Sequence, residues 1–201
     1  MAKGTETRNR IVEQALKDAS LFGLNGITLG ELAGRLGISK SGLFAHFGSK
    51  EELQLRVIEA AEQKFKAEVI APALKAPRGE PRVKALFEQW IAWGDTHDLP
   101  GGCVFSHAAM EMDDAPGPAR NALVKVHQSW LAFLEEAARN AIREGHFRPD
   151  LDVSLFAFQL TGIVAGYYRA SRLLHDANAH RHAMAAYEMV VERSVGGRSK
   201  V

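Results

Sequence analysis

The segment from Ile27 to Leu53 constrains the fold of this chain most, because it carries a start or stop signal at each helix boundary. Thr28 and Glu31 have the spacing of a capping box, which predicts that a helix begins just after Thr28. Gly37 is the residue type that most often ends a helix in the left-handed conformation. Ser39 can then cap a second helix. This part of the segment therefore predicts two short helices joined by a tight turn.

The remainder of the segment predicts where the second helix ends and a third begins. Gly48 can end the second helix, and Ser49 and Glu52 have the spacing of another capping box. Two short helices joined by a turn that contains glycine are the layout of a helix-turn-helix, whose second helix enters the major groove of DNA. We therefore expect the second helix to contact bases.

Residues 5–55 closely resemble the DNA-binding domain of TetR-type (TetR/AcrR) transcriptional regulators. The most specific parts of the match are the runs TLGELAGRLGIS and FAHFGSKEEL. The resemblance implies an all-α fold, with an N-terminal three-helix DNA-binding domain and a C-terminal helical domain that binds an effector and dimerises. The family often has Tyr at the position of Phe44, which has no hydroxyl to donate to a phosphate.

The domain organisation follows from helical periodicity and breakers. We predict helices over about 5–22, 49–70, 82–93, 104–112 and 179–195. We predict two further helices between residues 112 and 179, and we find no convincing strand pattern. We assign residues 1–52 to the DNA-binding domain and residues 53–201 to the effector-binding and dimerisation domain. The helix at about 49–70 links the two.

Charge and cysteine content fit a regulator that touches DNA with one end. Residues 1–50 carry seven Lys and Arg against four acids, a balance of +3, while the whole chain has a net charge of +1 and the remainder is slightly acidic. Cys103 is the single cysteine, so no disulfide can form within the chain, which fits a reducing compartment. No apolar run is long enough for a membrane span. We therefore expect a cytoplasmic protein.

The predicted DNA contacts combine base reading and phosphate binding. Lys40 can donate to the O6 and N7 acceptors of guanine, and Leu43 can pack on a thymine methyl. Thr28 and Lys50 open helices whose free N–H groups attract phosphate. The alternative for each side chain is a solvated helix face. The predicted DNA-binding residues are Arg8, Thr28, Lys40, Ser41, Gly42, Leu43, Phe44, His46 and Lys50.

Large apolar side chains after residue 80 predict an effector pocket. Any one of them is more often part of a helix-bundle core, but together they can line an apolar cavity with few polar groups, as small-molecule sites usually do. The family resemblance implies such a pocket, and hence a small, largely apolar or aromatic effector. The candidates are Trp90, Trp93, Phe105, Met110, Trp130, Phe133, Phe156 and Tyr167.

The last two helices are predicted to form a homodimer interface. They are apolar on more than one side, and Ala165 and Gly166 permit close helix approach. Packing within one chain is the alternative, but in the family that this chain resembles the final two helices pair with those of a second subunit. A two-fold dimer suits a palindromic operator in double-stranded DNA. We expect a repressor that its effector releases from this operator.

Two other functions remain open from the sequence. One is a helical enzyme that uses residues 103–113, with His107, Glu111 or Asp113 beside Cys103. The other is a DNA-binding protein that needs no effector. His107 and Glu111 are four residues apart and can share a metal ion, but the sequence places no third ligand. No nucleophile–base pair or cofactor motif is present, so we expect no catalytic residue, no cofactor and no metal.

Overall fold

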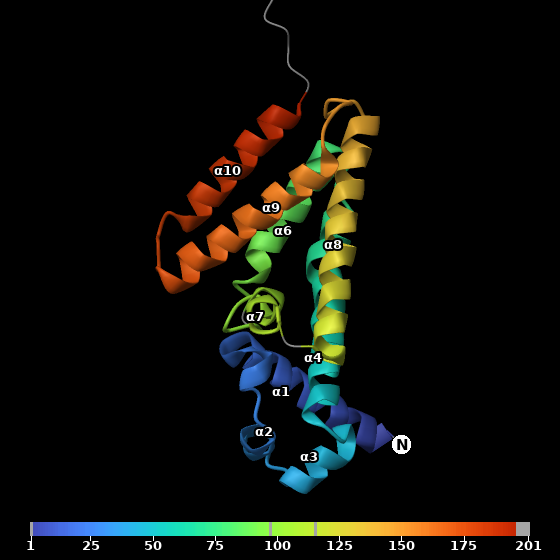
Figure 1. Ribbon diagram of the computed structural model, residues 1–201, viewed down its shortest axis with the longest axis vertical. Helices are drawn as coiled ribbons and strands as arrows, with labels where there is room; N and C mark the ends of the chain where they lie inside the picture. Colours follow the sequence, from blue (N-terminus) through green and yellow to red (C-terminus); the bar gives the residue numbers. More distant parts are fainter. Residues whose placement is uncertain (1, 97, 115, 196–201) are drawn as a thin grey trace, which may run out of the picture. The chain divides into compact units, whose positions relative to one another are not determined.

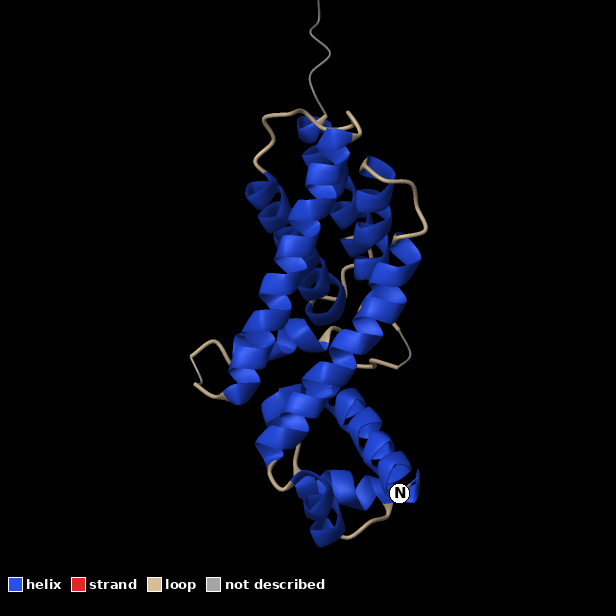
Figure 2. Ribbon diagram, turned by 90° about the vertical axis from the view of Figure 1, so that its right-hand side faces the viewer, coloured by secondary structure: helices blue, strands red, loops and turns tan. Residues whose placement is uncertain are grey.

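The computed structural model describes residues 2–96, 98–114 and 116–195, and these form helices and loops without a strand (Figure 2). The all-α prediction is confirmed. The helices are α1 (Ala2–Gly26), α2 (Leu29–Leu36), α3 (Lys40–Phe47), α4 (Lys50–Phe65), α5 (Ala71–Ala73), α6 (Glu80–Trp93), α7 (Val104–Glu111), α8 (Pro118–Arg143), α9 (Val153–Tyr168) and α10 (Ala179–Ser194), with π-helical segments η1 (Lys66–Ile70) and η2 (Arg169–Leu173).

The predicted helix boundaries around the turn are confirmed. The Thr28 Oγ1 accepts a hydrogen bond from the Glu31 N–H at 3.3 Å, so α2 starts directly after Thr28. Gly37 ends α2 with φ 66° and ψ 30°, the left-handed conformation that glycine adopts without a steric penalty. The Ser39 Oγ accepts the Gly42 N–H at 3.0 Å and so starts α3. Each helix end is therefore satisfied by a residue nearby in sequence.

The chain forms two compact units. Unit 1 comprises the described residues of Met1–Phe65 and Gly94–Val126, and unit 2 those of Lys66–Trp93 and His127–Val201. Unit 1 therefore contains α1 to α4 and α7, whereas unit 2 contains α6, α9 and α10. This division describes packing. The predicted boundary between residues 52 and 53 describes function, and it stays a prediction.

The core of unit 1 holds the helix-turn-helix in place. α1 packs against α4 and α7, and α2 packs against α3. Full burial of an aliphatic or Phe side chain contributes roughly 1.5–3 kcal/mol, so a few such residues stabilise this small head. The buried side chains that join these helices include Ile11, Ala15, Leu24, Leu32, Leu43, Phe47, Leu53 and Val57.

Unit 2 is built around a helical hairpin. α9 and α10 lie side by side, linked by η2 and a short loop, and α9 also packs against α6 (Figure 1). Asp152 caps α9 by accepting the N–H groups of Ser154 and Leu155, both at 3.0 Å. Among the described residues, no helix is long and apolar enough to cross a membrane.

Candidate nucleic-acid interface and effector region

α3 has one exposed face of mixed polarity and one apolar, buried face. Lys40, Ser41, Phe44 and Ala45 are exposed, and 52% of Phe44 is accessible. Phe47 is buried on the opposite face. The Lys40 side chain has no bonding partner within the described part of the chain, so its ammonium group is available to a ligand. The exposed face therefore offers a cation, a hydroxyl and an aromatic ring to a groove in DNA.

Leu43 does not belong to this face, and the prediction that it packs on a thymine methyl is wrong. Its exposed fraction is 0%, because the side chain lies in the three-helix core. Helical spacing accounts for the error, since Leu43 and Phe47 are four residues apart and lie on the same side of α3. Ala45 is an exposed position that the sequence analysis missed, although the same spacing from Ser41 marks it.

Gly42 lies close to the side chain of Ser39, the residue that caps α3. A Cβ on Gly42 would lie 3.0 Å from the Ser39 Oγ, the atom that accepts the Gly42 N–H. The Ser41 hydroxyl lies 3.2 Å from the same oxygen. Glycine therefore leaves room for the capping bond and for a close approach of the backbone. Contact of Gly42 and Ser41 with DNA stays a prediction.

The residues predicted to bind phosphate already have partners within unit 1. The Thr28 hydroxyl donates to Glu31 Oε2 at 2.9 Å, and Lys50 Nζ donates to the Asn25 carbonyl at 2.6 Å. Arg8 lies 5.3 Å from the centre of the Phe47 ring. These contacts hold the three side chains against the helices of unit 1. The Lys50 ammonium group has two further N–H donors.

Two other predicted contacts involve partly exposed side chains. One Arg8 guanidinium nitrogen lies 3.7 Å from Glu52 Oε1, and 41% of the Arg8 side chain is accessible. His46 is half-buried, with its ring centre 6.3 Å from that of Phe47. Both side chains retain ring or guanidinium donors that are able to meet a backbone phosphate. Their contact with DNA stays a prediction.

An ion pair between buried Asp18 and partly exposed Arg35 links α1 to α2. Asp18 is only 5% exposed and accepts hydrogen bonds from Arg35 and, at 3.0 Å, from Gln14 Nε2. Since Arg35 belongs to α2, this contact sets how the helix-turn-helix lies on α1. A buried carboxylate requires such partners, because an unpaired buried charge is costly.

The turn between α1 and α2 is held by side chains to which the sequence analysis did not assign this role. Glu111 Oε2 accepts the Asn25 N–H at 3.3 Å, and Gln54 Nε2 donates to the Leu24 carbonyl at 3.0 Å. A Cβ on Gly23 would lie 1.6 Å from Glu111 Oε1, and the φ of Gly23 is 75°. The two partners of the Glu111 bond are 86 residues apart, so no local signal identifies this contact.

Three of the predicted effector residues form one aromatic cluster in unit 2. The ring centres of Trp90 and Trp130 are 5.0 Å apart with an edge-to-face arrangement, and those of Trp130 and Phe133 are 5.8 Å apart and stacked. The Tyr168 hydroxyl donates to the Trp90 carbonyl at 2.8 Å. Trp130 and Phe133 are partly accessible, so this cluster presents aromatic surface as well as core.

The other predicted effector residues do not join this cluster. Met110 is 82% exposed in unit 1, so its assignment to an enclosed pocket is wrong. Phe105 also belongs to unit 1, where its ring centre lies 6.1 Å from that of Phe65. Phe156 packs against Phe147 at 5.4 Å, and Tyr167 against Tyr168 at 5.5 Å.

Core packing therefore accounts for Phe105 and Phe156, which are 7% and 1% exposed. Trp93 is likewise 1% exposed. Tyr167 is buried too, and its ring also lies 6.4 Å from that of His180. Of the predicted effector residues, only Trp90, Trp130 and Phe133 contact one another in a single cluster. Their contact with an effector stays a prediction.

The hairpin of α9 and α10 has an exposed apolar face. Leu155 is 52%, Phe158 71% and Met189 56% exposed. Between the helices runs a groove of about 370 Å³. Its lining residues are Gln159, Gly162, Ile163, Ala186, Met189, Val190 and Arg193. Several exposed large apolar side chains on two adjacent helices are typical of a protein–protein contact site.

Two of the residues that the alternative enzyme hypothesis uses, Cys103 and Glu111, are buried or already bonded. Cys103 is buried, and burial raises the pKa of its thiol, which disfavours the reactive thiolate. Glu111 is engaged with the Asn25 N–H. Over residues 2–96, 98–114 and 116–195, no group of three or more His, Cys, Asp or Glu side chains is placed to hold a metal ion.

Two family models match most of the chain. Residues 11–57 match the model described as "Bacterial regulatory proteins, tetR family". Residues 79–187, more than half of the chain, match the model described as "Tetracyclin repressor-like, C-terminal domain". The first match covers the helix-turn-helix, and the second covers the segment that runs from α6 into α10.

Individual relatives agree with the family models. The HTH-type transcriptional regulator SrpR of Pseudomonas putida is 24% identical over 166 residues, which cover 82% of this chain and 75% of SrpR. A TetR transcriptional regulator from Chloroflexus aurantiacus superposes with a TM-score of 0.85 at 25% identity, covering 96% of both chains. AibR, solved with isovaleryl coenzyme A and operator DNA, has a TM-score of 0.74 at 22% identity, covering 90% of this chain and 96% of AibR. The chain belongs to the TetR family of DNA-binding transcriptional regulators.

Proposed function

We propose that this chain represses transcription by binding a palindromic operator as a homodimer, and that a small, largely apolar or aromatic effector releases it. The observation that carries the proposal is the exposed face of α3, where Lys40, Ser41 and Phe44 project from a helix anchored by buried Leu43 and Phe47. A recognition helix needs this combination, because its base contacts are specific only when its position is fixed.

The dimer is assigned to α9 and α10. Phe158 and Met189 are more than half exposed on these helices, and Gly162 on α9 permits close approach of a second helix. An isologous contact of this face with its copy buries the apolar surface and gives the two-fold symmetry that a palindromic operator requires. A variant with Phe158→Glu is expected to be monomeric by analytical ultracentrifugation.

The effector is assigned to the aromatic cluster of Trp90, Trp130 and Phe133. Aromatic walls with few polar groups favour ligands that bury apolar or ring surface. The related AibR was solved with an acyl coenzyme A and operator DNA together, which supports a ligand-responsive regulator. Release of DNA requires only that the ligand bind one conformation of the protein more tightly than the other.

The deciding experiment selects bound duplexes from a random pool with the full chain at about physiological salt. We expect an enriched palindrome. Lys40→Ala is expected to lose about 1–3 kcal/mol at one operator position, with other positions unchanged. The exposed Lys75 of unit 2 provides the matched control, because Lys75→Ala removes the same charge away from α3.

Two other outcomes would replace the proposal. A pool without enrichment, and binding that vanishes as salt rises, would indicate an effector-independent protein that binds phosphates only. Turnover of a small molecule that is lost on His107→Ala would indicate an enzyme. We infer that the chain has no catalytic activity, because it belongs to a family of regulators. We also infer that it acts in the cytoplasm, because its single cysteine fits a reducing compartment.

A further inference from the structure

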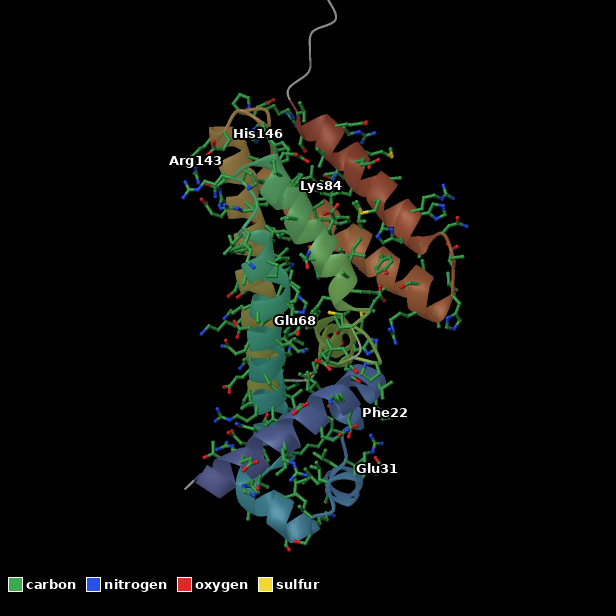
Figure 3. All side chains as sticks on the ribbon, turned by 180° about the vertical axis from the view of Figure 1, so that it is seen from behind. Phe22, Glu31, Glu68, Lys84, Arg143 and His146 are labelled. Atoms are coloured by element: carbon green, nitrogen blue, oxygen red, sulfur yellow. The ribbon has the colours of Figure 1, made fainter. Side chains whose placement is uncertain are left out.

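The helix-turn-helix begins at the kinked end of α1. α1 leaves helical geometry at Gly23, which has a φ of 75° and a ψ of 170°, and α2 starts at Leu29. The labels of Phe22 and Glu31 in Figure 3 mark the two sides of this connection. Because the connection is short, its conformation sets the direction in which α2 leaves α1. A contact that fixes residues 23–28 therefore helps to fix α3, which packs against α2.

A segment from much later in the chain lies against this end of α1. The described residues of 94–126 belong to the same compact unit as the helix-turn-helix, and α7 packs against α1 (Figure 1). In the loop before α7, the Gly101 N–H donates to the Oγ of fully buried Ser20 at 3.0 Å. A Cβ on Gly101 would lie 1.7 Å from the Ser20 carbonyl oxygen, so the two backbones meet without a side chain between them. This contact anchors the start of the α7 segment on α1.

A second contact holds the turn beyond the kink. Glu111, the last residue of α7, accepts the Asn25 N–H on Oε2 at 3.3 Å. α4 holds the same residue by its other polar groups, since Lys50 Nζ donates to the Asn25 carbonyl at 2.6 Å and Gln54 Nε2 donates to Asn25 Oδ1 at 3.3 Å. The turn that leads into the helix-turn-helix is therefore held by α4 and α7 together.

The hydrogen bond, and not the charge, accounts for a glutamate at position 111. A negative charge in a DNA-binding unit is unfavourable for attracting a polyanion. A carboxylate is, however, a stronger acceptor of a backbone N–H than a neutral group. The backbone also makes room for it, because a Cβ on Gly23 would lie 1.6 Å from Glu111 Oε1.

We propose that Glu111 is a positioning residue for DNA recognition, which holds the start of the helix-turn-helix through the Asn25 N–H. The proposal rests on the operator binding proposed above, and it makes the segment from Gly101 to Glu111 a working part of the DNA-binding domain. Glu111 acts through Asn25, whose carbonyl is bonded to Lys50, a residue predicted to bind phosphate.

Operator affinity distinguishes a positioning contact from one that only stabilises the fold. A contact that only stabilises α1 changes the unfolding midpoint and leaves the affinity of the folded protein for DNA unchanged. A positioning contact changes that affinity, because two recognition helices must fit two half-sites at a set spacing.

Two variants of Glu111 separate its hydrogen bond from its charge. Glu111→Ala removes both, whereas Glu111→Gln removes the charge and keeps an oxygen that accepts the Asn25 N–H. Fluorescence anisotropy with the selected palindromic duplex, at fixed salt, measures their affinities. We expect Glu111→Ala to bind about tenfold more weakly than the wild type, and Glu111→Gln to stay within about threefold. The matched control is Met110→Ala on the same helix, which removes an 82% exposed side chain and should bind as the wild type does.

Two further measurements report position directly. Against a duplex with one base pair added between the half-sites, the wild type is expected to prefer the selected spacing, and Glu111→Ala to show a smaller preference. Hydrogen exchange of the Asn25 amide, measured by NMR, is expected to be faster in Glu111→Ala and restored in Glu111→Gln. The exchange rate requires no DNA, so it separates a failure of this contact from a failure of the proposed operator binding.

Several results would overturn the proposal. Equal losses of affinity in Glu111→Ala and Glu111→Gln would show that the charge matters and the bond does not. A lower urea midpoint for Glu111→Ala with unchanged operator affinity would show that the contact only stabilises the fold. An Asn25 amide that exchanges at the wild-type rate in Glu111→Ala would mean that Glu111 does not hold the turn. Circular dichroism of each variant verifies that the helices are retained.

Discussion

Different kinds of contact stabilise the helix-turn-helix of unit 1 and the aromatic cluster of unit 2. They differ in how far apart in sequence the contacting residues lie. α2 and α3 start at hydrogen bonds between residues three apart, from Glu31 to Thr28 and from Gly42 to Ser39. In the aromatic cluster, Trp90 of α6 meets Trp130 of α8 through ring contacts across forty positions of sequence. The first kind of contact is a hydrogen bond between residues close in sequence, whereas the second is a packing contact between residues far apart in sequence.

The difference suits the two tasks. A recognition helix must keep one orientation, and the helix caps together with the ion pair of Asp18 and Arg35 provide it. An effector site must admit a ligand, and aromatic rings can pack in either stacked or edge-to-face arrangements, both of which occur in this cluster. We therefore expect substitutions in the helix-turn-helix to change folding or DNA binding, and substitutions in the aromatic cluster to change the response to ligand.

The largest expected effect separates the two faces of α3. Leu43→Ala removes a fully buried side chain and is expected to lower the free energy of unfolding by about 2–5 kcal/mol. Its neighbour Phe44 is 52% exposed, so Phe44→Ala should change stability little while weakening operator binding. Urea unfolding of both variants measures this contrast, and a stable Leu43→Ala variant with lost DNA binding would instead place Leu43 at the interface.

The next effect concerns the aromatic cluster. Trp130→Ala removes the ring that contacts both Trp90 and Phe133, and is expected to weaken effector binding about tenfold, or about 1.4 kcal/mol. Phe105→Ala, in unit 1, should destabilise the fold and leave effector affinity unchanged. Titration with the compound that releases the operator probe in a screen compares them, and equal losses would show that the cluster is not the binding site.

A smaller effect tests the local caps. Ser39→Ala removes the acceptor of the Gly42 N–H and is expected to cost about 1 kcal/mol of stability, with a matching loss in operator binding. Ser41→Ala, two residues away, removes an exposed hydroxyl and should leave the unfolding midpoint unchanged. If the two variants unfold alike, tertiary contacts rather than the cap decide where α3 begins.

The smallest expected effect tests whether the Asp152 cap of α9 in unit 2 stabilises its helix as the Ser39 cap of α3 does in unit 1. The N–H of Leu155, and then the hydroxyl and N–H of Ser154, lower the pKa of Asp152 below its ordinary value of 3.8. The folded state therefore favours the carboxylate. Its stabilising contribution is present above pH 3.8 and is lost as the pH falls through the lower folded pKa.

Asp152→Asn is expected to flatten this part of the dependence of the unfolding midpoint on pH. Thermal unfolding between about pH 2 and 5, which spans 3.8 and the lower folded pKa, measures it. Asp150→Asn, two residues before the cap, is the control. Identical pH profiles for the wild type and Asp152→Asn would mean that the cap bonds contribute no pH-dependent stability to α9.

Local signals account for what could be predicted of the fold. The caps at Thr28 and Ser39 and the end at Gly37 lie where we predicted them, because each depends on residues within one helical turn. For the first helix we predicted an end near residue 22, and α1 leaves helical geometry at Gly23. For the candidate site, periodicity correctly predicts that Lys40, Ser41 and Phe44 are exposed. The prediction for Leu43 was wrong because it considered only that an apolar side chain can pack on a thymine methyl. It did not consider that Leu43 lies on the same side of the helix as buried Phe47.

The chain's own sequence determined the all-helical class and the helix-turn-helix boundaries, since caps, glycine conformations and apolar periodicity act over a few residues. The family followed from the resemblance of the runs TLGELAGRLGIS and FAHFGSKEEL to TetR-type regulators. Only the tertiary structure decided that Leu43 is core, that Glu111 holds the turn at Asn25, and that Met110 is exposed while Trp90 meets Trp130. The physical reason is that burial and side-chain pairing depend on which distant surfaces come together. The free energy of transferring an apolar side chain out of water does not depend on its position in the sequence. Tertiary packing decides which apolar side chains are actually removed from water.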